Sequence, residues 1–101
     1  MEIRTQLEES SARIVLAGRF EFSSHRSFRE ATEQILGRSA VEQLDVDLGA
    51  VSYLDSSALG MLLMLRDKAQ SAGCVLRLAS CSNAVKQVLD VANFQKLFTM
   101  V

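Results

Sequence analysis

The sequence predicts an α/β fold with a single mixed β-sheet, mostly parallel after an N-terminal hairpin, and with helices packed on it. Stretches of strand-like alternation and of helical periodicity follow one another in the order ββαβαβαβ. Strands separated by helices of this length favour parallel pairing through right-handed crossovers. The 101 residues, of which 49% are hydrophobic, suffice for one domain over residues 1–101 with one core.

The first two strands are expected to form an antiparallel hairpin. Ile3, Thr5 and Leu7 alternate with polar residues, which predicts a strand with one solvent-facing side. After a polar turn, residues 13–17 form a more continuously apolar strand that ends at Gly18. Two short strands with a tight connection favour antiparallel pairing.

The first helix is expected to begin at one of the serines at positions 23, 24 and 27, each of which offers an N-cap. Ser27 and Glu30 have the spacing of a capping box, and Gly37 is well placed at the C′ position. The residues expected on its apolar face are Phe28, Ala31, Ile35 and Leu36.

The third strand is predicted at residues 43–48, and residues 49–54 link it to the next helix. Its leucines and valine face the core, whereas Asp45 and Asp47 lie on the opposite face as ordinary surface residues. The remaining elements are a helix from Ser57 to Ala72-Gly73, a strand at 74–79, a helix from 82 or 83 to 92, and a short strand at 97–101.

Composition excludes several classes of function. The net charge is −1 and no basic stripe is visible, so no nucleic-acid partner is expected. The N-terminus lacks the apolar stretch of a signal peptide, and serines, a glycine and Asp55 interrupt residues 48–65, so we expect a cytoplasmic protein without a membrane span. Cys74 and Cys81 fit neither a CxxC pair nor a zinc half-site and are interpreted as half-buried thiols.

The second helix carries the most informative pattern. Residues 58–65 contain no charge over two turns, so this helix needs burial on more than one side. A helical projection gives a core side, flanked by Leu59 and Leu63, that comprises Ala58, Met61, Leu62, Leu65, Ala69 and Ala72. The opposite stripe comprises Ser56, Gly60 and Met64, then Asp67, Lys68 and Ser71, with Ser57 beside them.

Gly60 needs an explanation, because glycine inside a helix costs about 1 kcal/mol relative to alanine. One interpretation is close packing against the backbone of the chain itself. The other is close approach by another protein, with Met64 as an adaptable apolar contact. The position of Gly60 on the polar stripe favours the second interpretation.

Ser56 and Ser57 stand where this helix begins, and either serine or Asp55 is a candidate cap. The same place suits a phosphoserine, because free N–H groups and the helix dipole stabilise an anion there. A phosphate adds about −1.5 to −2 charges. Beside Asp55 and an apolar surface, that charge would oppose the binding of a partner. The residues alone do not decide between Ser56 and Ser57.

Enzyme, metal and cofactor signals are absent from the sequence. The single histidine, His25, lies in a polar stretch that heads the first helix. There is no G-x-S-x-G elbow, P-loop, dinucleotide-binding glycine pattern or metal-ligand cluster. We expect a protein that is not an enzyme, and a hydrolase using Ser57 and His25 is the least favoured alternative.

The run Val51-Ser52-Tyr53-Leu54-Asp55-Ser56-Ser57-Ala58-Leu59-Gly60 resembles the signature of the STAS family, specifically bacterial anti-sigma factor antagonists. In that family an Asp-Ser-Ser/Thr-Gly-Leu-Gly motif opens the second helix, and the serine after the aspartate is phosphorylated; here that serine is Ser56. The likeness extends to residues 18–21, 73–76 and 82–85. Ala58 departs from the family glycine, and Glu21 replaces the family aspartate near the phosphosite.

The resemblance implies a regulator that works by partner switching. The unphosphorylated form binds an anti-sigma factor that is also a serine kinase of histidine-kinase-like ATPase fold, and so releases a sigma factor. Phosphorylation on Ser56, rather than Ser57, abolishes binding, and a PP2C-type serine phosphatase resets the protein, which is monomeric when free. The residues expected to meet the partner are Glu21, Ser23, Asp55, Ser56, Ser57, Gly60, Met64 and Asp67.

An alternative is a STAS subunit that binds its partner without phosphorylation, as in a lipid-transport ATPase complex or the regulatory domain of a transporter. The same helix face would then be a permanent interface. The retained Asp55-Ser56-Ser57 run argues mildly against this alternative.

Overall fold

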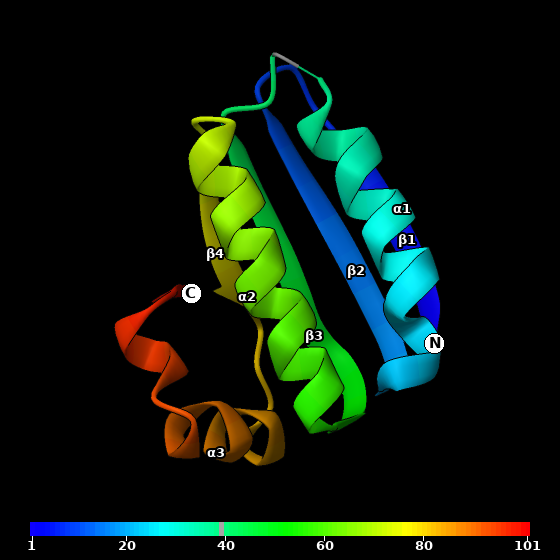
Figure 1. The fold of residues 1–101 in the computed structure, drawn as a ribbon, viewed down its shortest axis with the longest axis vertical. Coiled ribbons are helices and arrows are strands. Elements are labelled where there is room, and N and C mark those ends of the chain that lie inside the picture. The colour runs from blue at the N-terminus through cyan, green and yellow to red at the C-terminus, as the bar shows by residue number, and fades with distance from the viewer. Residues whose placement is uncertain (39) are drawn as a thin grey trace.

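The computed structural model describes residues 1–38 and 40–101, and its elements follow the predicted order ββαβαβαβ (Figure 1). The strands are β1 Glu2–Leu7, β2 Ser11–Phe20, β3 Gln43–Leu54, β4 Val75–Ala79 and β5 Thr99–Met100. The helices are α1 His25–Leu36, α2 Ser56–Ser71 and α3 Asn83–Val91, with short 3-10 turns η1 Phe22–Ser24 and η2 Phe94–Lys96.

One mixed sheet with the strand order β1-β2-β3-β4-β5 organises the molecule. β1 pairs antiparallel with β2, and the other neighbours are parallel, which confirms the predicted hairpin and crossovers. The carboxyl ends of the parallel strands therefore point to one end of the sheet. The starts of α1 and α2 and the whole of α3 lie at that end (Figure 1).

The helices α1 and α2 lie side by side over one face of the sheet (Figure 1). The alternation in β3 buries Leu44, Val46 and Leu48 completely beneath them, as predicted. Further fully buried side chains come from β2, α2 and α3: Ile14, Leu16, Phe20, Leu62 and Leu89. The core thus lies between the sheet and the two helices, and it holds the start of α2 in place.

Helix α1 begins after Ser24, one of the three serines expected to precede it, but the predicted capping box of Ser27 and Glu30 is wrong. Its first residue is His25, and the 3-10 turn η1 leads directly into it. Ser24 occupies the N-cap position without a side-chain capping bond, so Ser27 already lies inside the helix. The chain enters α1 through a turn whose backbone bond from Ser24 N–H to the Glu21 carbonyl measures 2.8 Å.

Further boundaries differ from the prediction, and β2, expected to end at Gly18, spans Ser11–Phe20. Gly37 ends α1 in a right-handed conformation with φ −71°, whereas Gly73 has φ +69°, as the expected C′ residue does. The predicted link at residues 49–54 is strand, because β2 pairs with β3 as far as Phe20↔Leu54. β5 is also shorter than expected, because only two of its residues pair with β4.

The opposite face of the sheet carries no helix in residues 1–38 and 40–101, and paired charges occupy it. Arg13, Asp45 and Arg77 lie in register on three adjacent strands. Arg77 donates two hydrogen bonds to Asp45, each of 2.7 Å, and Arg13 donates one of 2.7 Å to Asp47. Asp45 is only 8% exposed, so its interpretation as an ordinary surface residue is wrong.

The arginines favour the charged form of Asp45. Its hydrogen bonds with Arg77 hold the pKa of the Asp45 carboxyl below its usual value, and the nearby charge of Arg13 acts in the same direction. The Asp45 carboxylate is therefore favoured in the folded state.

Candidate functional site

Asp55 caps helix α2. Its backbone is extended, and its Oδ1 accepts a hydrogen bond of 2.8 Å from the Ala58 N–H. Its Oδ2 accepts a second bond of 3.1 Å from the Phe22 N–H, in the turn before α1. One carboxylate thus joins the starts of both helices. The sequence alone left open whether Asp55, Ser56 or Ser57 caps α2. The bond from the Phe22 N–H to Asp55 joins residues 33 positions apart, so no local pattern predicts it.

Ser56 is the first residue of α2 and is not the cap. Its side chain is exposed, whereas Ser57 is half-buried. Within residues 1–38 and 40–101, neither hydroxyl forms a hydrogen bond. The Ser56 hydroxyl is therefore accessible to a protein that would modify or contact it.

Gly60 lies one turn beyond Ser56, and the chain itself does not explain it. A Cβ built on Gly60 meets no described heavy atom within 4 Å outside its own neighbourhood in the helix. Close packing against the chain's own backbone is therefore excluded for the part of the chain that the structure describes. A glycine here leaves the backbone of α2 open to a close approach from outside.

The outward surface of α2 is apolar in its first half. Met64 is 50% exposed and Leu63 is 37% exposed, with Gly60 between Ser56 and Met64 along the helix. Asp67 continues the surface and is also exposed. The predicted core side is confirmed except for Ala72, which follows the end of the helix and is exposed. We call Ser56, Gly60, Leu63, Met64 and Asp67 the α2 stripe.

An apolar hollow extends the α2 stripe towards α3. It is lined by Leu59, Gln87, Val88, Val91 and Ala92 and has a volume of about 350 Å³. Sequence reasoning placed Leu59 and Leu63 beside the core and did not single out α3. In the structure Val88 is 38% exposed and Val91 86% exposed, which local periodicity does not predict.

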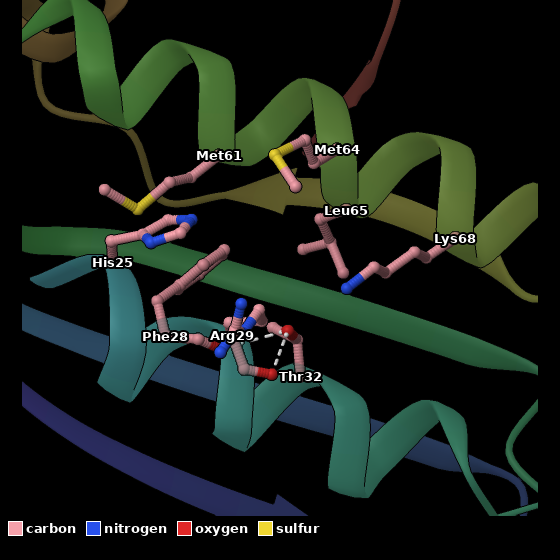
Figure 2. Close-up of a pocket in the computed structure, with 8 residues that line it drawn as sticks. All are labelled: His25, Phe28, Arg29, Thr32, Met61, Met64, Leu65 and Lys68. Atoms are coloured by element: carbon pink, nitrogen blue, oxygen red, sulfur yellow. Dashed lines mark hydrogen bonds between the residues drawn. The ribbon is translucent and has the colours of Figure 1, made fainter. Parts of the chain in front are cut away.

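A narrow groove separates α1 from α2 on the other side of the stripe. His25, Phe28 and Thr32 of α1 face Met61, Met64 and Leu65 of α2 across it, with Arg29 and Lys68 at its margin (Figure 2). Its volume is about 20 Å³, which accommodates a water molecule and not a substrate. His25 faces the methionines here, so the structure does not bring it together with Ser57 as a catalytic pair.

The other predicted partner residues lie at the same end of the sheet. Glu21 is half-buried, and its Oε2 accepts a hydrogen bond of 3.3 Å from Arg19 Nε. Ser23 is exposed in the turn η1. Glu21 and Ser23 therefore flank Phe22, whose N–H is bound by Asp55. The structure brings these loop residues to the start of α2.

The described residues offer few groups that could bind a metal ion or react covalently. The described residues contain no cluster of three or more potential metal ligands. Cys74 and Cys81 are free, and burial raises the pKa of both thiols, which lowers their reactivity. No helix of the described chain is long and apolar enough to cross a membrane. The arrangement offers a surface for contact, with one exposed hydroxyl in it.

Two comparisons of sequence bear on this site. The sequence model of a family described as "Mlab, STAS domain" matches residues 3–101. A STAS-domain containing protein of Pseudomonas aeruginosa is 45% identical over 85 residues, which cover 84% of this chain and 82% of that protein.

Solved structures of similar fold include anti-sigma factor antagonists. The STAS domain protein of this kind from Planctomyces limnophilus has a TM-score of 0.84 at 18% identity, covering 97% of this chain and 87% of that one. The anti-sigma factor antagonist SpoIIAA in its unphosphorylated form has a TM-score of 0.78 at 18% identity, covering 99% and 87%. Bacillus SpoIIAA in the phosphorylated form has a TM-score of 0.76 at 15% identity, covering 99% and 91%. At these identities the likeness concerns the fold.

Proposed function

Because this chain belongs to the STAS domain family, we propose that it is an anti-sigma factor antagonist whose α2 stripe binds a partner and whose Ser56 is phosphorylated to end that binding. The observation that carries the proposal is Gly60 with nothing packed on it, between an exposed serine and an exposed methionine. Glycine at this position does not stabilise the helix, because alanine would favour the helical conformation more. A partner that approaches the backbone there would need it.

The physical basis of the switch is the cost of burying charge. Met64 and Leu63 lose water when a partner covers them, which favours binding. A phosphate on Ser56 would bring about −1.5 to −2 charges into the same contact. The start of α2 tolerates this anion in the free protein, because the helix dipole favours it. In the complex the anion would be desolvated beside Asp55, which opposes binding.

The proposed partners perform the chemistry on this protein. They are a serine kinase of histidine-kinase-like ATPase fold, which is also the anti-sigma factor, and a PP2C-type serine phosphatase. In this scheme the protein acts in the cytoplasm as a monomer, needs no cofactor and is not an enzyme. Glu21, Ser23, Asp55 and Ser57 surround Ser56 and would contact the kinase.

The test uses the kinase encoded nearest to the gene of this protein. With ATP, intact-mass analysis should detect one added phosphate, which is lost in Ser56→Ala and retained in the control Ser57→Ala. Ser56→Ala should bind the kinase constitutively, and Ser56→Asp should bind it at least tenfold more weakly. Absence of phosphate from the wild-type protein would overturn the proposal.

A second candidate is a STAS subunit that binds permanently, in a lipid-transport ATPase complex or a transporter. The description of the matched family model, which names Mlab, favours keeping this candidate. It predicts stable co-purification with an ATPase that is unaffected by Ser56→Asp. The switch predicts that the same substitution releases the partner.

A further inference from the structure

Phe22 is an exposed aromatic residue that the sequence did not single out. Its side chain is 74% exposed, although phenylalanine is among the residues most often buried. The other four phenylalanines of the chain are all buried in the core. The fold therefore gains little from the ring of Phe22, and burial by another molecule would recover its hydrophobic free energy.

The backbone that carries Phe22 is held firmly. Its N–H donates to Asp55 Oδ2 at 3.1 Å, and the turn closes with the bond of 2.8 Å from Ser24 N–H to the Glu21 carbonyl. The Ser24 hydroxyl donates a further bond of 3.4 Å to the Arg19 carbonyl. A contact side chain on a preorganised backbone loses little entropy when it binds.

The backbone of Phe22 is joined to the start of α2, where the α2 stripe begins. The carboxylate that binds its N–H belongs to Asp55, the residue immediately before Ser56. On the other side, η1 leads into His25, which shares the groove with Met64 (Figure 2). A partner that covers Ser56 and Met64 is therefore placed to reach Phe22 as well.

We infer that Phe22 is an aromatic anchor of the partner interface and fills an apolar pocket on the serine kinase that binds the α2 stripe. This inference rests on the proposed function and adds a residue that decides affinity and partner choice. Aromatic residues in desolvated pockets supply most of the binding energy of many interfaces. A phosphate on Ser56 would place its charge next to this anchor, so that one modification opposes burial of the whole contact.

The test measures affinity by isothermal titration of unphosphorylated protein with the purified kinase encoded nearest to its gene. Phe22→Ala should weaken binding by about tenfold or more, the range expected for an interface anchor. Phe22→Leu keeps an apolar side chain and should recover most of the affinity. The matched control is Val75→Thr, on the helix-free face of the sheet, where a 56%-exposed residue should be replaceable without effect on binding.

Thermal unfolding checks that the variants are folded, so that a loss of binding can be assigned to the side chain. All three variants should unfold within about 2 °C of the wild-type midpoint, as expected for exposed side chains. Wild-type affinity in Phe22→Ala, with binding still lost in Ser56→Asp, would overturn the anchor and leave the proposed switch intact. If the wild-type protein neither binds the kinase nor is phosphorylated by it, both proposals fall. A change in the oligomeric state of Phe22→Ala at unchanged kinase affinity would instead assign Phe22 to self-association and overturn the inference.

Discussion

The α2 stripe and the helix-free face of the sheet both face solvent, but they differ in whether their side chains have partners. On the sheet, Arg77 and Arg13 satisfy Asp45 and Asp47 through hydrogen bonds and ion pairs between strands. On α2, Leu63 and Met64 lose contact with water only if another molecule covers them. The sheet face is complete within the chain, whereas the α2 stripe is not.

Two glycines show the same difference. A Cβ on Gly49, in β3, would lie 3.1 Å from Asp47 Oδ1 and 3.3 Å from the Ser80 carbonyl oxygen. A Cβ on Gly60 would meet no atom of residues 1–38 and 40–101 within 4 Å, apart from its own stretch of the helix. A side chain at Gly49 would thus be crowded by atoms of the chain itself, whereas Gly60 has no such constraint. A residue that nothing within the described chain explains therefore points to an external contact.

The largest effect on stability is expected from breaking the charge pairs of the sheet. Asp45→Ala leaves two arginines without their shared carboxylate and should lower the free energy of unfolding by about 2 kcal/mol. Urea denaturation measures this change. Affinity for the kinase should stay at the wild-type value, and a loss of binding in a folded variant would contradict the separation of the two surfaces.

Loss of the Asp55 carboxylate should lower both the stability of the protein and its affinity for the kinase, each to an intermediate degree. Asp55→Ala removes the cap of α2 and the bond to the Phe22 N–H, with an expected cost of about 1–2 kcal/mol. The same variant should bind the kinase more weakly, because the turn with Phe22 loses its bond to the start of α2. Thermal unfolding and titration together separate these effects, and Ser82→Ala, which removes the α3 cap, serves as the control.

Alanine at the two glycines should give opposite changes in stability. Gly60→Ala should raise the free energy of unfolding by up to about 1 kcal/mol, since alanine favours helix and no atom obstructs its Cβ. Gly49→Ala should lower it by about 1 kcal/mol, because Asp47 is held by Arg13 and cannot easily move. Gly60→Ala should nevertheless weaken kinase binding; unchanged binding would remove the functional explanation of this glycine.

The smallest expected effect is a dependence of the free energy of unfolding on pH. The pKa of Asp45 is lowered by Arg77, so the unfolded state takes up its proton at a higher pH than the folded state. The stabilisation is present above the unfolded pKa of about 4 and is lost as pH falls through the folded value. Urea midpoints between pH 7 and pH 3 should fall less in Asp45→Asn than in wild type. An equal fall would show that Asp45 is not the responsible group.

Much of the architecture and part of the site follow from the sequence by itself. Alternation in β3 determined which of its residues enter the core, and Gly73 marked the end of α2 because it adopts positive φ easily. The motif around Ser56 likewise placed the candidate phosphosite at a helix start. These features depend on neighbours within a few positions, so local periodicity and backbone preference suffice to predict them.

Only the tertiary structure decided which residues meet across the chain and which remain uncovered. The carboxylate of Asp55 bonds to Phe22 over 33 positions, and that of Asp45 bonds to Arg77 over 32. The open space beside Gly60 and the exposure of Phe22 depend on how α1, α2 and the sheet pack. Local patterns cannot reveal them, because a side chain's solvent exposure is set by every element that packs, or fails to pack, against it.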